Sequence, residues 1–434
     1  MKKFILIFFL LLFEFSYLNA ENHLSFYINE AYNKNFELNA ERENFKAVEQ
    51  NINISKSEFL PSLTIEGKQS SLQSTNRTDN SGAPLADSNL DTQSKSINVE
   101  QKIFQGFKGY NSYKKSELQV KRSSSKLKQV EQETILNTAI VYYDLILKSD
   151  TKNFNIDNVS LFERQVESDK VRLQKGEITL TDLAQSESSL AGANADLIIA
   201  DTELQNVKIN FEKIVGLKPP LINSLSKNKN FKLKLPKTLS EALSEALKNN
   251  PEFLMAEIDS LIAEKDLAIE KAKLSPKASL NFTKSETNET SLTIDQVDQE
   301  KVEAKISWPI IKGGENIASI KKFNFKNKQA KLTFKNLKNQ TKSKTTNAWS
   351  NYKSSESVLM ATKSQLEAAE IANEGITLEY DSGSNRTTLE LIQSRSLLLD
   401  ARISNARAQR NFIISQFELL KEIGKLDINT VKNI

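Results

Sequence analysis

The sequence predicts an α+β protein built from one duplicated unit, with very long helices and short strands that need further copies of the chain to close into a barrel. Three observations support this fold class: an internal repeat, two long stretches almost free of proline and glycine, and short segments in which apolar and polar residues alternate. Only 38% of the residues are apolar and 8% aromatic, which is low for a chain of 434 residues with a large dry core. Long solvated helices are therefore favoured.

Composition also narrows the possible chemistry. The chain has no cysteine, so disulfides, thiol catalysis and thiolate metal sites are excluded. The single histidine is His23, near the N-terminus, which excludes every catalytic or metal site that needs an internal histidine. The lysine-rich stretch 321–344 alternates with apolar residues, which predicts a solvated helix face rather than a nucleic-acid site. We expect no enzyme activity, no cofactor, no metal and no nucleic-acid partner.

The N-terminus has the order of a secretory signal. Lysines follow Met1, an apolar run covers Phe4–Phe13, and a polar stretch ends at the small residue Ala20. Ten apolar residues are too few for a membrane-spanning helix, which needs about 20. We therefore predict a signal peptide at 1–20, cleaved after Ala20, and export of the mature chain.

An internal duplication organises the rest of the chain. Asn29–Glu37 parallels Ser244–Glu252 at an offset of 215 residues, and Gly106 parallels Gly313 at an offset of 207. The drop in offset predicts a longer insertion in the first copy between these points. The predicted segments are a first repeat at 21–220, a linker or equatorial segment at 221–236, a second repeat at 237–426 and a short tail at 427–434.

Each copy shows the same order of elements. A helix leads to two strands, identified by alternation of apolar residues such as Ile97, Val99 and Ile103 with polar ones. The polar segments 69–95 and 283–300, between the paired strands, are expected to be exposed loops. The predicted strands lie near 61–68, 96–104, 277–283 and 301–308, and the long helices cover 107–215 and 314–423.

The helical regions are too long for a compact domain. Between Gly106 and Gly176 there is no proline, and a continuous helix of 70 residues would be about 105 Å long. Beyond Gly176 apolar residues recur every seven positions, the spacing of a coiled coil. This stripe consists of Leu183, Leu190, Leu197, Leu204 and Phe211. On periodicity alone, a soluble periplasmic coiled-coil scaffold remains an alternative.

The strands argue for a membrane protein instead. Four strands per chain leave two open edges, whose N–H and C=O groups cannot remain unpaired in lipid. Closed barrels usually need at least eight strands, and three copies of the chain would supply twelve. We therefore predict a barrel shared by three chains and continued by a shared helical tube.

At this point the chain resembles the TolC family of trimeric outer-membrane channel proteins, over essentially its whole mature length. The motifs that carry the resemblance are Gln101–Gly106, Thr181–Glu187, Val215–Pro219, Pro309–Gly314 and Arg386–Leu391. The family fold implies a twelve-stranded β-barrel, an α-helical barrel in the periplasm and an equatorial region around the linker. Thr181–Glu187 and the ending Ile423–Leu426 are most similar to the branch that serves type I secretion.

The resemblance also implies function and partners. It predicts a passive exit path across periplasm and outer membrane, for type I protein secretion, small-molecule efflux or both. The implied partners are two further copies of the chain, a periplasmic adaptor, an ABC exporter or a proton-driven pump in the inner membrane, and outer-membrane lipid. A carboxylate-based hydrolase is a third and weaker hypothesis, because no paired-acid pocket can be identified.

The family's gate pattern falls on residues near the far ends of the long helices. The resemblance assigns the gate to Asp182, Tyr380, Arg386 and Glu390, and the hairpin tips that would contact an adaptor to Gly176 and Gly383. In the family, the arginine and the tyrosine of one hairpin hold the aspartate of another. Here an extra residue, Asn385, precedes Arg386, and Gln393 stands where a second acidic ring is often found.

Overall fold

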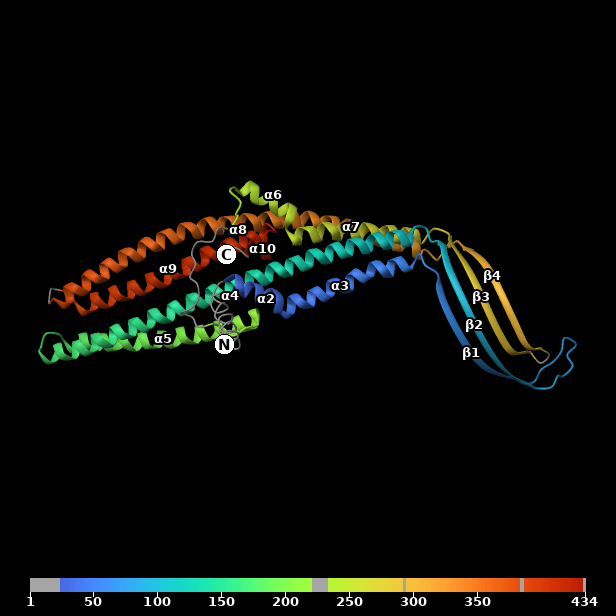
Figure 1. Ribbon diagram of the computed structural model, residues 1–434, viewed down its shortest axis with the longest axis horizontal. Helices are drawn as coiled ribbons and strands as arrows, with labels where there is room; N and C mark the ends of the chain where they lie inside the picture. The colour runs from blue at the N-terminus through green and yellow to red at the C-terminus, as the bar shows by residue number, and fades with distance from the viewer. Residues whose placement is uncertain (1–23, 221–232, 292–293, 383–385, 432–434) are drawn as a thin grey trace, which may run out of the picture. The chain divides into compact units, whose positions relative to one another are not determined.

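The computed structural model describes residues 24–220, 233–291, 294–382 and 386–431 (Figure 1). The predicted signal peptide, most of the predicted linker, Gly383 and Asn385 lie outside these ranges. The chain forms two compact units, each assembled from separated segments. Unit 1 contains residues up to Arg42, Ser125–Leu254 and Leu337 onwards; unit 2 contains Glu43–Ser124 and Met255–Asn336. Each unit therefore takes segments from both predicted repeats.

Unit 2 contains one antiparallel sheet of four strands in the order β1-β2-β3-β4 (Figure 1). Its strands are β1 (Ser62–Ser74), β2 (Ser88–Phe104), β3 (Lys277–Ser291) and β4 (Ile294–Ser307). The pairings Leu63–Val99, Val99–Phe282 and Phe282–Val302 align apolar residues across all four strands. β1 and β4 are left as the two edges.

The strands are longer than the apolar alternation predicts. Most of the polar segments 69–95 and 283–300, which we expected to be loops, continue the strands; Gln69 pairs with Gln93 and Ser70 with Thr92, for example. The expectation was wrong because it depended on apolar alternation alone. Hydrogen bonds between strands form equally well where both faces of a sheet are polar, and there the sequence gives no period to detect.

The helices of unit 2 follow the order of the strands. They are the second half of α3 (Phe36–Ser57), the start of α4 (Lys108–Gln174), α7 (Pro251–Ala272) and the start of α8 (Glu315–Asp381). Lys115 and Asp266 join α4 to α7 at 2.7 Å, and the Ser319 hydroxyl donates to Glu270 at 2.7 Å between α8 and α7. α3 and α8 are therefore the outer helices.

Unit 1 contains the main hydrophobic core. Around the long helices it adds α2 (Leu24–Lys34), α5 (Leu180–Val215), α6 (Leu239–Asn249), α9 (Thr388–Glu422) and α10 (Ile428–Val431). Tyr27 of α2 contacts Phe211 of α5 with ring centroids 5.3 Å apart. The largest fully buried side chains include Tyr142, Leu145, Phe211, Phe417 and Leu420.

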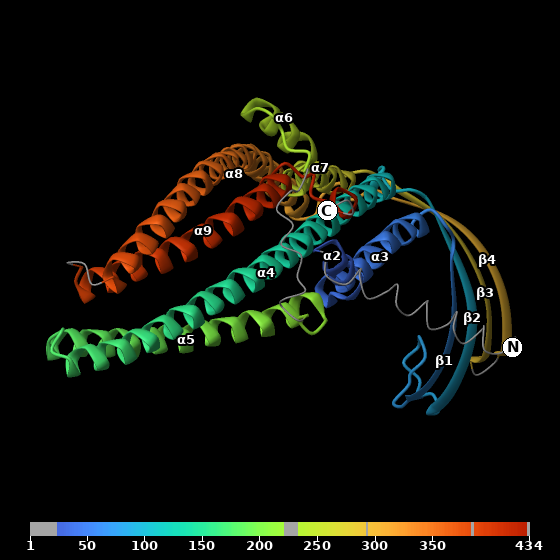
Figure 2. The same cartoon turned by 60° about the vertical axis from the view of Figure 1, so that its left-hand side comes forward.

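Two helical hairpins, α4/α5 and α8/α9, extend from this core (Figure 2). In unit 1, the predicted seven-residue stripe faces inward, since Leu183, Leu204 and Phe211 are buried. α4 alone has 67 residues, which corresponds to about 100 Å of helix. Over the ranges that the structure describes, none of the helices combines the length and apolar character needed to cross a bilayer.

Candidate functional site

The turn between α4 and α5 fixes one predicted gate residue. Gly176 adopts a left-handed conformation (φ 71°) after α4, and Thr179 then caps the start of α5. The Asp182 carboxylate accepts a hydrogen bond from the Thr179 backbone N–H at 2.9 Å, while the Asp182 N–H donates to the Thr179 hydroxyl. The carboxylate also accepts from the Thr179 hydroxyl at 2.7 Å, and the two bonds that it accepts from Thr179 lower the pKa of Asp182. Within one chain, Asp182 therefore acts as a capping residue.

The start of α9 repeats this arrangement. Thr387 is the N-cap, and its backbone N–H donates to the Glu390 carboxylate at 2.8 Å, which lowers the pKa of Glu390. Arg386 donates to Glu379 at 2.5 Å and to Glu390 at 3.1 Å. Arg386 thus binds acids of its own hairpin, and its predicted bond to Asp182 of another hairpin stays a prediction.

Tyr380 is where the two hairpins meet. Its ring is 4% exposed, and its hydroxyl donates to Asp169 of α4 at 3.0 Å. The Gln165 amide donates to the same hydroxyl at 3.1 Å, and the Arg172 guanidinium lies 4.6 Å from the ring centroid. Burial raises the pKa of Tyr380, so this residue stays protonated and can donate. An aspartate does bind the tyrosine, but within one chain it is Asp169 rather than Asp182.

Sequence reasoning missed Asp169 itself. Its side chain is fully buried, and its second oxygen accepts a hydrogen bond from Ser186 of α5 at 2.6 Å. Gln165 donates to the first oxygen at 2.9 Å, so the carboxylate has donors from α4, α5 and α8. A buried carboxylate is tolerated only when hydrogen bonds replace its water. The available signal was Ser186, a hydroxyl inside the apolar stripe of α5.

Arg395 makes a second connection between the hairpins. Its guanidinium donates to the backbone carbonyl of Leu161 in α4 at 3.3 Å and lies 6.0 Å from the Phe162 ring centroid. Burial lowers the pKa of Arg395. Two polar contacts about two turns apart along α4, at Leu161 and Asp169, therefore hold α4/α5 against α8/α9.

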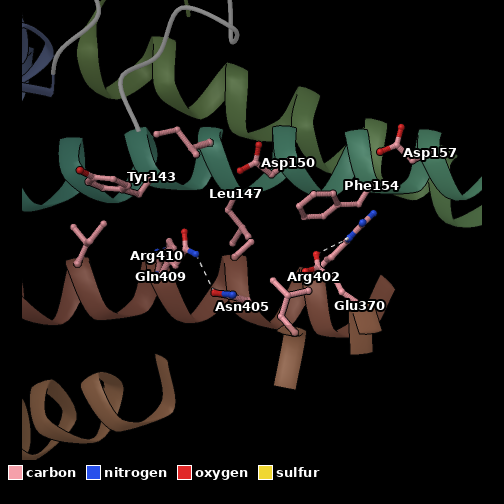
Figure 3. Close-up of a pocket in the computed structure, with 14 residues that line it drawn as sticks. Tyr143, Leu147, Asp150, Phe154, Asp157, Glu370, Arg402, Asn405, Gln409 and Arg410 are labelled. Atoms are coloured by element: carbon pink, nitrogen blue, oxygen red, sulfur yellow. Dashed lines mark hydrogen bonds and ion pairs between the residues drawn. The ribbon is translucent and has the colours of Figure 1, made fainter. Parts of the chain in front are cut away.

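A groove lies further along the same helices, between α4, α8 and α9 (Figure 3). It has a volume of about 470 Å³ and combines apolar side chains with charged ones such as Asp150, Glu370 and Arg402. Arg410 also lines the groove, and it donates to Asp144 at 2.8 Å. The groove mixes both signs of charge.

The two faces of the sheet differ in chemistry. One face exposes large apolar side chains: Leu63 is 66% exposed, Val302 71% and Ile306 78%. The opposite face is polar, and there Thr283 donates to Asn98 at 3.0 Å across β3 and β2. An exposed apolar face of this kind is typical of a surface that contacts lipid or another protein.

Long helical hairpins, together with a sheet that has one exposed apolar face, are features expected of a subunit of a membrane channel. A family model described as "Outer membrane efflux protein" matches residues 27–217 and 242–425. The chain therefore belongs to the outer membrane efflux protein family and is an outer-membrane protein. Members of this family act as channels.

Relatives with assigned names agree with this family. The chain is 24% identical over 398 residues to the outer membrane efflux protein BepC of Brucella suis, a match that covers 92% of the chain and 84% of that protein. It is 24% identical over 312 residues to the outer membrane protein TolC of Escherichia coli, covering 69% of the chain and 63% of TolC.

Solved structures share the fold. The chain superposes on the channel protein CusC with a TM-score of 0.80 at 16% identity, covering 92% of both chains. It superposes on the Campylobacter jejuni CmeC outer membrane channel with a TM-score of 0.80 at 15% identity, covering 93% of the chain and 85% of CmeC.

Proposed function

We propose that three copies of this chain form a channel through the outer membrane, continued by a helical tunnel in the periplasm. The observation that carries this proposal is the sheet of unit 2, which has four strands, two open edges and one exposed apolar face. Unpaired strand edges cannot remain in lipid, so the edges must pair with other copies. Three copies give a closed barrel of twelve strands.

The apolar face supports an orientation toward lipid. Ile97 to Ile103 on β2 spans about 20 Å, close to the roughly 25 Å apolar band of outer-membrane barrels. Trp308 follows β4, is 62% exposed and donates to the Leu274 carbonyl, a position suited to the membrane interface. The polar face with Asn98 and Thr283 would then line the pore.

We place the gate at the hairpin ends of unit 1. Opening would move α4/α5 away from α8/α9 and break the bond of Tyr380 to Asp169, while the bond of Ser186 to Asp169 stays within the α4/α5 hairpin. Between copies, Arg386 and Asp182 would add contacts, and three Glu390 carboxylates would face the pore. Gly176 and Gly383 would mark the hairpin tips that a periplasmic adaptor contacts. The adaptor would connect the channel to an ABC exporter or a proton-driven pump in the inner membrane.

The cargo we propose is small molecules, with protein secretion as the second candidate. The relative that aligns over 92% of the chain is named an efflux protein, which favours small-molecule cargo. The run Thr181–Glu187 supports protein secretion through its similarity to type I secretion channels. Deleting the gene separates them: loss of efflux raises dye and detergent sensitivity, whereas loss of secretion removes a protein from the culture medium.

Fractionation and channel recording test the proposal as a whole. We expect the protein in the detergent-extracted outer membrane, a mass of three chains in detergent, and discrete conductance steps in planar bilayers. A protein released with the periplasmic extract as a monomer without conductance would instead support the coiled-coil scaffold.

A further inference from the structure

Helix α8 contains a long basic segment. Residues 316–355 include ten lysines and no aspartate or glutamate. Lys344 pairs with Glu252 at 2.7 Å and Lys353 with Glu356 at 3.0 Å. The other eight lysines have no acidic partner among the residues that the structure describes. Because the whole chain has a formal net charge of only +4, positive charge is concentrated in this segment.

Six of these lysines form one row along α8. They follow one another at spacings of seven, three, four, three and four residues, which keeps their side chains on one face of the helix. The row consists of Lys321, Lys328, Lys331, Lys335, Lys338 and Lys342, and all six are exposed. From the first lysine to the last, the row is about 32 Å long at 1.5 Å per residue.

The duplicated helix α4 shows how the same positions look on a face with balanced charge. At the offset of 207 residues, the row corresponds to Lys114, Lys121, Ser124, Lys128, Glu131 and Ile135. There Lys114 pairs with Glu117 at 2.9 Å, and the counterpart of Glu117 on α8 is Asn324. Helix α4 therefore balances its lysines with acids, whereas α8 does not.

An unbalanced row of lysines destabilises the helix that carries it. Side chains three or four residues apart are neighbours on a helix, and like charges at these spacings repel each other. From Lys328 to Lys342 the row contains four such pairs in succession. A mixture of both charges, as on α4, would keep the face equally soluble without this repulsion. The row therefore indicates a surface that binds an anionic partner.

The row faces the outside of the proposed tunnel. Trp349 is 18 residues, or five helical turns, after Lys331 and so lies on the same face of α8. In unit 1, Trp349 lines a hollow together with Leu233 and Leu235, which follow the predicted linker. These segments must lie outside the wall of a tunnel that conducts cargo, because three copies of them inside it would obstruct the passage. The lysines on this face are therefore open to the periplasm.

We infer that the lysine row binds the carboxylates of the peptidoglycan of the cell wall. This inference rests on the proposed channel, whose helices cross the periplasm. Lysine ammonium groups form charge-assisted hydrogen bonds with carboxylates. The amides of Asn324 in the row and of the exposed Asn339 beside it can donate to and accept from sugar hydroxyls and peptide groups. A sugar polymer with carboxylate-bearing peptides supplies partners for both kinds of side chain.

The length of the row favours a polymer over a lipid surface. In the proposed channel α8 runs from the membrane into the periplasm, so anionic lipid headgroups would meet only its first turns. Electrostatic attraction between exposed charges falls off over about 8 Å at physiological salt, whereas the row is about 32 Å long. The lysines farthest from the membrane would then have no partner. A wall polymer around the channel can contact the row along its whole length.

Co-sedimentation with purified, protein-free peptidoglycan tests the inference. We expect the natural trimer in amphipols to sediment with the polymer at low salt and to be released as salt is raised, since salt screens exposed charges. Lys331→Gln with Lys335→Gln should lower the affinity roughly tenfold or more. The matched control, Lys322→Gln with Lys326→Gln, removes the same charge at the same spacing from the opposite face of α8 and should bind like the natural chain.

Blocking the carboxylates of the polymer provides the second test. Peptidoglycan whose carboxylates have been converted to amides should no longer retain the natural trimer. Equal binding to amidated and untreated polymer, or an equal loss of binding in both double variants, would overturn the inference. A natural trimer that stays in the supernatant, or that binds phosphatidylglycerol vesicles in place of peptidoglycan, would also overturn it.

The proposed channel is judged by separate measurements. Both double variants leave the strands and the contacts of the hairpins unchanged, so they should still form trimers that conduct in planar bilayers. Conducting trimers that do not bind peptidoglycan would refute the role of the lysine row alone. A natural chain that neither forms trimers nor conducts would instead refute the proposed channel.

Discussion

Gly424, just after α9, occupies a position that only glycine fits. Its φ is +73°, and an added Cβ would lie 2.2 Å from the Asn249 carbonyl oxygen. We expect Gly424→Ala to lower the free energy of unfolding by about 3 kcal/mol, through backbone strain and steric overlap. Gly192 in α5 is the matched control: an added Cβ there meets nothing within 4 Å, so Gly192→Ala should stabilise by about 1 kcal/mol. Thermal unfolding in detergent measures both.

Glu422 at the end of α9 makes stability depend on pH. Burial raises its pKa, an effect that Glu252 and Glu418 reinforce and that Lys421 and Lys344 oppose. The folded chain therefore binds more protons than the unfolded chain above the usual carboxyl range, and stability falls as pH rises through the raised pKa.

Replacing Glu422 with glutamine removes this penalty. We expect Glu422→Gln to raise the melting temperature at pH 7.5. Near pH 4 we expect almost no change, because the Glu422 carboxyl is then mostly protonated in both the folded and the unfolded chain. Glu212→Gln, at an exposed position on α5, serves as the control. An equal melting temperature for Glu422→Gln and the natural chain at pH 7.5 would contradict the prediction.

At the residue scale, sequence could identify residues that a repeat or a resemblance marks. Gly176 was predicted as a hairpin tip, and it has the left-handed conformation that a tight turn needs. Asp169 could not be identified, because a carboxylate in a long helix has the same sequence pattern whether it is solvated or buried. Its burial depends on Tyr380 and Ser186, which reach it from two other helices.

At the element scale, the contact between α4 and α8 depends on the Tyr380 hydroxyl. Tyr380→Phe keeps the ring but leaves the buried Asp169 with one donor fewer, at a cost of about 1.5–3 kcal/mol for a bond to a charged group. If the closed channel needs this bond, its loss shifts the closed–open equilibrium roughly 10- to 150-fold. We expect a higher open probability in planar bilayers.

Two further variants test whether the effect of Tyr380→Phe comes from the lost bond to Asp169. Tyr110→Phe, at a half-exposed position near the start of α4, should leave open probability unchanged. Asp169→Asn keeps an acceptor for Tyr380 but removes the charge, so it should open the channel less than Tyr380→Phe. Recordings of Tyr380→Phe that match the natural channel would show that the hairpins part elsewhere.

The apolar face of the sheet gives a second prediction at this scale. Val302 is 71% exposed in the apolar row of β4, so Val302→Lys should cost about 2–4 kcal/mol if that face contacts lipid. Glu303→Gln changes the next residue, on the opposite face, and should be tolerated. Yield of assembled protein in the outer membrane measures the difference. Equal yields for the two variants would contradict a lipid-facing Val302.

Strand length is where prediction of elements from sequence failed. The hydrophobic alternation around Ile97 and Val99 marks only the part of β2 that carries the apolar face. The polar extensions form because β1, β2 and β3 hold one another by backbone bonds, as in the pair Ser94–Thr287. A pairing of this kind depends on the partner strand, which lies up to about 200 residues away in the chain.

At the scale of the whole molecule, family membership and element order could be predicted, whereas the compact units could not. The repeats divide the chain near residues 221–236, yet each unit combines segments of both. The reason is that every long hairpin starts in one unit and ends in the other: α4 begins in unit 2 and ends in unit 1. A repeat is recognised from the order of residues along the chain, but a compact unit is defined by contacts between segments that are far apart in the sequence.

The assembled channel allows one prediction that no single chain can show. Threefold symmetry would bring three Glu390 carboxylates around one axis, and a ring of carboxylates favours cations. Gln393 is already neutral, so this selectivity would depend on Glu390. Glu390→Gln removes the charge while glutamine can still complete the capping box with Thr387, and Arg386 keeps its bond to Glu379. The start of α9 should therefore remain folded.

We expect Glu390→Gln to move the reversal potential measured across a salt gradient toward zero, because the pore loses its preference for cations. Glu356→Gln is the matched control, since Glu356 lies on α8 and pairs with Lys353 of the same helix at 3.0 Å. The control should keep the natural reversal potential. If Glu390→Gln also keeps it while trimers still form, the carboxylates of α9 do not face the pore, and selectivity must arise elsewhere, with the polar face of the sheet as the next region to test.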